Sequence, residues 1–207
     1  QTTQITQDGA QNNIINGTTD WVYEEEFGFT QGFHFSPDSK LLAYYRLDES
    51  AVPQFTMDKY GKLYPERQTF KYPKAGEKNA LVEIHIHDLA AGKAVKVDLG
   101  RETDQYVPRI FWTRSADKLA VLRLNRHQNK LDILFADSKT GAAQTILTEQ
   151  SKTYVDVTDE TVTFLEKTDQ FLLLSEKDGF NHLYLYDYAG KEVRKVTQGA
   201  WEITKFY

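Results

Sequence analysis

The feature that most constrains the fold is a repeat of about fifty residues. Three segments with alternating apolar and polar residues each end in Asp and are followed by Gly; they are residues 83–88 before Gly92, 131–137 before Gly141, and 182–187 before Gly190. Their Asp residues, at positions 88, 137 and 187, lie 49 and 50 residues apart. An Asp side chain can bond the turn backbone, and Gly readily adopts positive φ, so each segment predicts a β-hairpin.

A second hairpin pattern precedes the first in each unit. It consists of an apolar strand, a polar turn and another apolar strand, at residues 33–44, 110–121 and 162–173. Two hairpins per unit give four antiparallel strands, the composition of a β-propeller blade. No long stretch with helical periodicity is present, so we predict an all-β protein. About three blades are too few for a closed ring of roughly four to eight, which indicates a partial β-propeller.

The spacing also indicates an insertion in the first unit. Lys118 and Gln170 are separated by 52 residues, whereas Lys40 and Lys118 are separated by 78, which leaves about 26 extra residues. We expect a hairpin arm at about residues 47–70. Its apolar side chains cannot all be buried within one hairpin. From the residues alone, the arm either meets another surface or folds back over its own blade.

The two ends of the chain resemble each other. Residues 4–9 (QITQDG) are similar to residues 195–199 (KVTQG). We therefore expect the chain to begin on the outer strand of one blade and to end where another begins. The whole of residues 1–207 would then be one portion of a propeller domain in a larger protein.

Composition excludes several classes of function. The net charge of -5, without a cluster of Lys or Arg, argues against nucleic-acid binding. The absence of Cys excludes disulfides, thiolate metal sites and a Cys nucleophile. His85 and His87 lie on one face of a predicted strand and could begin a metal site, but no third ligand accompanies them. We predict neither a metal nor a cofactor.

Three consecutive carboxylates, Glu24, Glu25 and Glu26, lie between aromatic residues. Adjacent like charges repel, and aromatic neighbours remove some of the water that screens them. In a helical turn, successive side chains diverge by roughly 100°, so one interpretation is a solvated acidic turn. The other is a binding site for a cation.

The chain resembles the propeller domain of the dipeptidyl peptidase IV family, serine peptidases of the prolyl oligopeptidase clan. The motifs that carry the resemblance occur in the family's order; they are residues 20–26 (DWVYEEE), 35–38 (FSPD), 42–44 (LAY), 52–53 (VP), 72–76 (YPKAG) with Asn79, 178–184 (DGFNHLY) and 199–202 (GAWE). The resemblance covers nearly the whole chain, and the first and fifth motifs are not shared by propellers in general.

This resemblance implies an eight-bladed propeller that covers a C-terminal α/β-hydrolase domain, with the active site between them. Glu25 and Glu26 would bind the free α-ammonium of a peptide substrate, and the full-length enzyme would release Xaa-Pro or Xaa-Ala dipeptides. Glu24 would point elsewhere, and Trp21 and Tyr23 would pack the turn. The arm would pair two subunits as a homodimer. The family also implies a periplasmic or secreted, cell-envelope location.

The sequence lacks parts of the family pattern. The nucleophile motif Gly-x-Ser-x-Gly, with the Asp and His that follow it, is absent, so we expect this segment alone to be inactive. An Arg that the family supplies from an earlier blade is absent too. One alternative is a non-catalytic propeller that binds proteins. Another is a clan relative that cleaves internally or removes acylated residues, although a glutamate pair fits poorly with substrates that lack a free amine.

Overall fold

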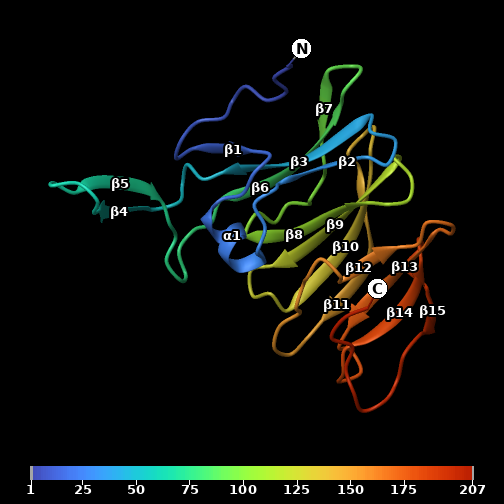
Figure 1. Ribbon diagram of the computed structural model, residues 1–207. Coiled ribbons are helices and arrows are strands. Elements are labelled where there is room, and N and C mark those ends of the chain that lie inside the picture. Colours follow the sequence, from blue (N-terminus) through green and yellow to red (C-terminus); the bar gives the residue numbers. More distant parts are fainter. Residues whose placement is uncertain (1, 207) are drawn as a thin grey trace.

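The computed structural model describes residues 2–206, whose strands form four antiparallel sheets (Figure 1); three of these have four or five strands, and we call them blades 1, 2 and 3. Blade 1 contains β1 (Ile14–Asn16), β2 (Phe33–Phe35), β3 (Leu41–Asp48), β6 (Leu81–Asp88) and β7 (Lys93–Lys96). Blade 2 contains β8 (Gln105–Trp112), β9 (Lys118–Asn125), β10 (Lys130–Asp137) and β11 (Ala143–Gln150). Blade 3 contains β12 (Val162–Phe164), β13 (Gln170–Ser175), β14 (His182–Asp187) and β15 (Glu192–Lys195).

Strands in blades 2 and 3 pair in chain order, each with the next. This is the arrangement predicted from two hairpins per unit, and the all-β, partial-propeller fold is confirmed. The middle strands of each blade supply a core that includes the fully buried side chains of Ile84, Leu122 and Phe171. Burial alternates along β6 and β13, whereas β9, β10 and β14 are buried at consecutive residues, as expected where both faces of a strand are covered.

Blade 1 differs because its edge strand is interrupted. Both β1 and β2 pair with β3, Asn16 opposite Arg46 and Phe33 opposite Tyr44. Residues 17–32 leave the sheet between them and contain the short helix α1 (Trp21–Phe27). An isolated bridge between Thr18 and Gln31 closes the base of this excursion. The carboxylate run thus lies on a helix raised from the edge of a blade.

Two of the repeat glycines lie in close contact with the backbone of the preceding blade. A Cβ atom at Gly141 would lie 2.1 Å from the carbonyl oxygen of Lys96 in blade 1. A Cβ atom at Gly190 would lie 2.0 Å from the carbonyl oxygen of Ile146 in blade 2. Both glycines also have positive φ, +74° and +78°. The turn from Asp to Gly, which has three intervening residues before Gly141 and two before Gly190, therefore serves both the hairpin and the contact with the preceding blade.

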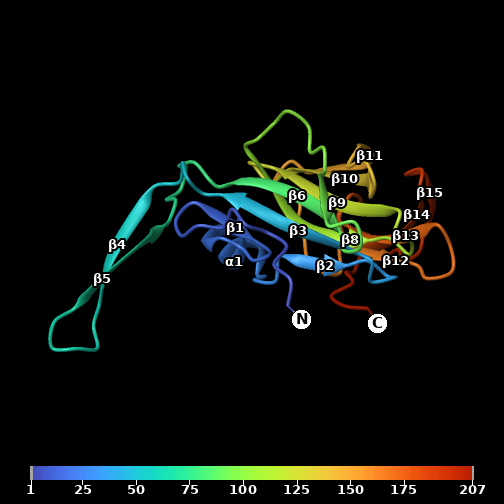
Figure 2. The ribbon, with the colours of Figure 1, turned by 90° about the horizontal axis from the view of Figure 1, so that it is seen from above.

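The insertion forms a two-stranded hairpin, β4 (Gln54–Lys59) with β5 (Glu66–Lys71), which we call the arm. Leu47 and Asp48, placed at the start of the expected insertion, belong instead to β3, where Leu47 is fully buried in the core. Figure 2 shows the arm extending away from the blades rather than over them. The structure therefore does not have the arrangement in which the arm folds back over its own blade.

The terminal segments do not form strands within the described residues. Residues 4–9, for which we predicted the outer strand of a blade, are unpaired, because a strand needs a neighbour to supply ladder hydrogen bonds. Near the other end, the Trp201 ring packs edge-on against His182 at 5.2 Å. The described part of the chain has no helix long and apolar enough to cross a membrane.

Candidate functional site

Helix α1 is short, and it is capped at both ends. The carboxylate of Asp20 accepts a hydrogen bond from the backbone N–H of Tyr23 at 3.0 Å. At the other end Gly28 adopts the left-handed conformation, with φ of 70°, and its N–H donates to the carbonyl oxygen of Glu24. Isolated helices of this length are marginal, so these caps and the packing below the helix hold it.

The buried face of α1 fixes the helix to blade 2. Val22, Tyr23 and Phe27 are buried, and Tyr23 thus packs the turn as expected, whereas Trp21 is 38% exposed. The hydroxyl oxygen of Tyr23 accepts from the backbone N–H of Val107 at 2.9 Å. The Arg109 guanidinium donates to the Phe27 carbonyl oxygen at 2.9 Å. Both contacts come from β8, so the helix is anchored along its length.

The opposite face presents the three glutamates to solvent. Glu24, Glu25 and Glu26 are all exposed. No Lys, Arg or His of the described chain forms an ion pair with any of them. Only Glu26 has a side-chain hydrogen bond, from the amide of Gln128 at 2.6 Å. Three negative charges therefore lie within one turn of helix without an internal cation, and the structure gives Glu24 no structural partner among the described residues.

A second arginine of blade 2, Arg126, is engaged by other groups. Arg126 lies in the turn between β9 and β10, and its guanidinium pairs with Asp104 at 3.3 Å and donates to the carbonyl oxygen of Glu77. It also lies 5.8 Å from the centre of the Tyr106 ring. Burial raises the pKa of the Tyr106 hydroxyl, and the negative charge of Glu26 acts in the same direction. Arg126 therefore forms its ion pair with Asp104 and not with Glu26.

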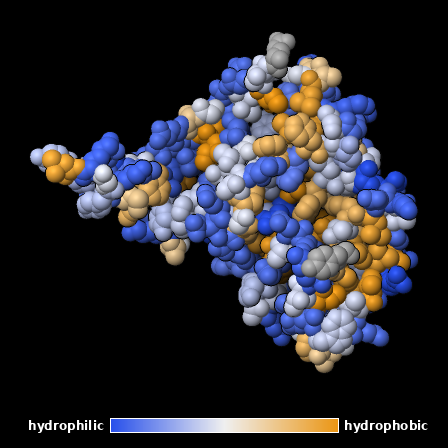
Figure 3. Space-filling view, viewed as in Figure 1, coloured by the Kyte–Doolittle hydropathy of each residue, from blue (hydrophilic) through white to orange (hydrophobic). Residues whose placement is uncertain are grey.

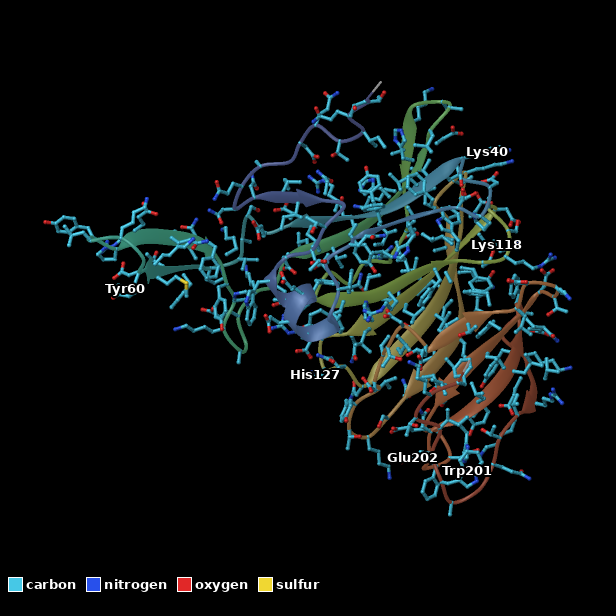
Figure 4. The ribbon with its side chains drawn as sticks, in the orientation of Figure 1. Lys40, Tyr60, Lys118, His127, Trp201 and Glu202 are labelled. Atoms are coloured by element: carbon cyan, nitrogen blue, oxygen red, sulfur yellow. The ribbon has the colours of Figure 1, made fainter. Side chains whose placement is uncertain are left out.

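Aromatic rings connect α1 to the arm. The ring centres of Trp21 and Tyr72 are 4.3 Å apart, and Tyr72 lies 5.6 Å from Phe55 of β4. Since residues four apart share a helix face, Glu25 lies on the same side as Trp21, toward the arm, and Glu26 on the side of Val22. In Figure 4, His127 marks the turn between β9 and β10, below α1. The pair of carboxylates is therefore flanked by the arm base and by blade 2.

The predicted histidine pair is held by protein contacts. His85 stacks on the Tyr44 ring at 5.4 Å, and its Nε2 lies 3.1 Å from the carboxylate of Glu83. His87, two residues along β6, is buried. The described residues contain no group of three or more His, Cys, Asp or Glu able to hold a metal ion.

Comparison with known proteins assigns the family. The family described as "Dipeptidyl peptidase IV (DPP IV) N-terminal region" matches residues 1–207. The chain belongs to the dipeptidyl peptidase IV family. It is 31% identical to a probable dipeptidyl peptidase 4 of Aspergillus clavatus over 98% of this chain and 28% of that protein. It is also 31% identical to a dipeptidyl peptidase 4 of Arthroderma otae, over 99% of this chain and 28% of that protein.

Solved structures of dipeptidyl peptidase IV relatives have the same fold. Porphyromonas gingivalis dipeptidyl peptidase 4 matches with a TM-score of 0.91 and 46% identity, over 98% of this chain and 29% of that one. A putative dipeptidyl aminopeptidase IV from Bacteroides ovatus matches with a TM-score of 0.85 and 28% identity, over 97% and 31%. The chain therefore spans less than a third of the length of the relatives that it matches.

Sequence reasoning singled out the glutamates but not the residues around them. Gln128 is 102 residues from Glu26, in a turn with no recognisable motif. Arg109 and Tyr72 likewise reach α1 from other elements. Tyr72 opens the motif at residues 72–76, but its contact with α1, like those of Gln128 and Arg109, depends on the three-dimensional arrangement and is not indicated by a local pattern.

Proposed function

We propose that Glu25 and Glu26 bind the free α-ammonium of a peptide substrate, and that the full-length protein is a serine-type dipeptidyl peptidase that releases Xaa-Pro or Xaa-Ala dipeptides. The observation that carries the proposal is that these carboxylates are exposed on an anchored helix with no ion-pair partner in the described chain. Membership of the dipeptidyl peptidase IV family supports the reaction class.

The chemistry of an ammonium group suits this arrangement. It has three N–H donors and can make charge-assisted hydrogen bonds to two carboxylates at once. A unit charge pair about 4 Å apart gains about 1 kcal/mol in bulk water and about 4 kcal/mol at an effective dielectric near 20. The interaction becomes strong when a second domain encloses the site, as we propose for the α/β-hydrolase domain of the same chain.

Fixing the amine would also determine where the peptide is cut. An α-ammonium bound at Glu25 and Glu26 lies at a set distance from a nucleophile on the facing domain, so that the second peptide bond is the one presented. The segment itself has no Gly-x-Ser-x-Gly motif, so we assign it substrate binding and assign the Ser-Asp-His chemistry to the hydrolase domain.

We further propose that the arm pairs two copies of the chain as a homodimer. Tyr60, Leu63 and Tyr64 on its tip are 79%, 92% and 80% exposed. Figure 4 shows Tyr60 far from the blades, and Figure 3 shows apolar atoms at the end of the projection. Large apolar side chains in a cluster on a projecting hairpin fit an interface better than free solvent. By family resemblance, we also propose that the protein acts in the periplasm or outside the cell.

The test of the function compares two substrates of the full-length protein. An Ala-Pro anilide with a free amine should be hydrolysed, and the same anilide with an acetylated amine should be hydrolysed at least about 100-fold less efficiently, because the charge-assisted bonds are lost. Equal rates on both substrates would contradict the ammonium site. Absence of hydrolysis of either would support a non-catalytic binding propeller instead.

A further inference from the structure

The side chain of Gln128 is the one group of the described chain that donates a hydrogen bond to a carboxylate of the run. Its Nε2 lies 2.6 Å from Oε1 of Glu26, across 102 residues of sequence. The contact joins the turn between β9 and β10 of blade 2 to helix α1 of blade 1. Within residues 2–206, no other side-chain hydrogen bond joins the glutamates of α1 to the blades.

The backbone of Gln128 is in an unusual conformation. Its φ is +54°, in the left-handed region, which is costly for most residues and which Gly, Asn and Asp adopt more readily. The position is thus occupied by Gln, a residue type less suited to this conformation than the Asn129 that follows it. Strain of this kind persists where the surroundings enforce it, and often at functional sites. The longer side chain has the reach that the contact with Glu26 uses.

The turn around Gln128 is held in place by other bonds. The side-chain oxygen of Asn125 accepts from the backbone N–H groups of Asn129 and Lys130, both at 3.0 Å. The Gln128 carbonyl oxygen accepts from the N–H of Val155, in the segment leading to blade 3, at 2.7 Å. A chain of contacts therefore runs from Glu26 through Gln128 to the connection between blades 2 and 3, and hydrogen bonds on both sides of Gln128 hold its backbone in place.

An amide is a suitable donor for this purpose. It orients one carboxylate oxygen and adds no positive charge, so Glu26 keeps its full negative charge for a ligand. A Lys or Arg in the same place would form an ion pair and compete with an incoming ammonium. The second oxygen of Glu26 has no partner in the described chain, and neither has the Glu25 carboxylate.

We propose that Gln128 is a positioning residue that orients the Glu26 carboxylate toward the substrate α-ammonium. This inference rests on the proposed function. Gln128 does not contact substrate; it reduces the rotamer freedom that Glu26 would otherwise lose on binding. Its effect should therefore fall on substrate affinity and leave the chemical step nearly unchanged.

The test measures KM and kcat of the full-length protein for the free-amine anilide, and the dissociation constant of an Ala-Pro dipeptide by calorimetry. Gln128→Ala should raise KM and the dissociation constant about 5- to 20-fold, with kcat within about twofold, as expected for loss of one hydrogen bond to a charged group. Gln128→Asn keeps an amide and suits the left-handed backbone, but it is one methylene shorter, so it should behave like the Ala variant.

Two further variants separate orientation from general stability. Gln128→Glu keeps the length but replaces the donor by a carboxylate, so dipeptide binding should weaken at neutral pH and partly recover at lower pH, where the two carboxylates share a proton. His127→Ala, in the same turn, should match the unchanged protein.

The results distinguish failure of the proposed role of Gln128 from failure of the proposed ammonium site. If Glu26→Gln weakens binding but Gln128→Ala and Gln128→Asn do not, or if these lower only the melting temperature, Gln128 is structural and the inference is wrong. If Glu26→Gln also leaves affinity unchanged, the ammonium site itself is wrong.

Discussion

The hydroxyl oxygen of Tyr23 accepts a hydrogen bond from the backbone N–H of Val107, 2.9 Å away and 84 residues later in the chain. Tyr23 is 2% exposed and lies in helix α1; Val107 is fully buried in β8. This contact joins the element that carries the glutamates to the neighbouring blade. The orientation of the candidate site therefore depends on packing between two blades.

Tyr23→Phe should lower the free energy of unfolding by about 1–2 kcal/mol, because the Val107 N–H loses its partner while remaining buried. Chemical denaturation of both proteins would measure the difference. Tyr60→Phe removes a hydroxyl from the exposed arm and should cost nothing measurable. Equal stability of all three proteins would mean that the bond does not anchor the helix.

Gly141→Ala should destabilise the protein more than Gly92→Ala. Both positions have positive φ, which costs an Ala residue roughly 1 kcal/mol. Only at Gly141 would the added Cβ also meet a backbone oxygen of the preceding blade; at Gly92 nothing lies within 4 Å. We expect at least about 2 kcal/mol of additional loss in denaturant unfolding of Gly141→Ala. Similar losses for both variants would show that the turn conformation alone requires Gly.

Asp20 gives a prediction that depends on pH. Burial raises the pKa of its carboxyl above the ordinary value of 3.8, even though the carboxylate accepts the Tyr23 N–H. Since the folded state holds the proton more tightly, ionised Asp20 disfavours folding above the raised pKa, and this penalty is absent below 3.8. Asp20→Asn keeps the cap without the charge, so its stability relative to the unchanged protein should be higher at pH 7 than at pH 3.5.

Asp20→Ala is the matched control, because it removes the cap as well as the charge. It should lose about 1 kcal/mol of stability relative to Asp20→Asn at both pH values. A difference between the Asn variant and the unchanged protein that stays constant with pH would contradict the assignment of a buried, ionised cap.

The arm gives a prediction about assembly. Leu63→Ser with Tyr64→Ser should convert a dimer of the full-length protein to monomers in light scattering, because these exposed apolar side chains would otherwise be buried against the second copy. Tyr154, an exposed aromatic residue outside the arm, provides the control as Tyr154→Ser. A dimer that persists after removal of residues 54–71 would place the interface elsewhere.

Much of the fold could be predicted because its signals are local. The Asp and Gly of each repeat, such as Asp137 with Gly141, determine a turn within five residues, and the apolar segments on either side of the turn predict the paired strands. For helix α1 the sequence offered a helical turn only as one interpretation of the carboxylate run, because seven residues give no usable periodicity from which to predict its bounds. The outer strand predicted at residues 4–9 was wrong because strand formation depends on a neighbouring strand, which the segment itself does not encode.

In the candidate site too, some residues could be predicted from the sequence and others could not. The carboxylate run could be noticed from the sequence, but the residues alone left a solvated acidic turn open, and Glu25 and Glu26 were singled out within it only by the resemblance to the dipeptidyl peptidase IV family. Gln128 could not be predicted, because its contact with Glu26 depends on how blade 1 meets blade 2. Tyr72, whose ring packs on Trp21, reaches α1 only because the arm leaves the blade beside the helix.

The central claim is tested most directly by kcat/KM of the full-length protein for a free-amine Xaa-Pro substrate after single Glu-to-Gln changes in the run. Glu25→Gln and Glu26→Gln should each lower kcat/KM by about 30- to 1,000-fold, as expected for loss of a charged partner in an enclosed site, with the melting temperature unchanged. Glu24→Gln, the adjacent control, should stay within about threefold. Near-normal turnover by the Glu25 and Glu26 variants, or an equal loss in all three, would contradict the account.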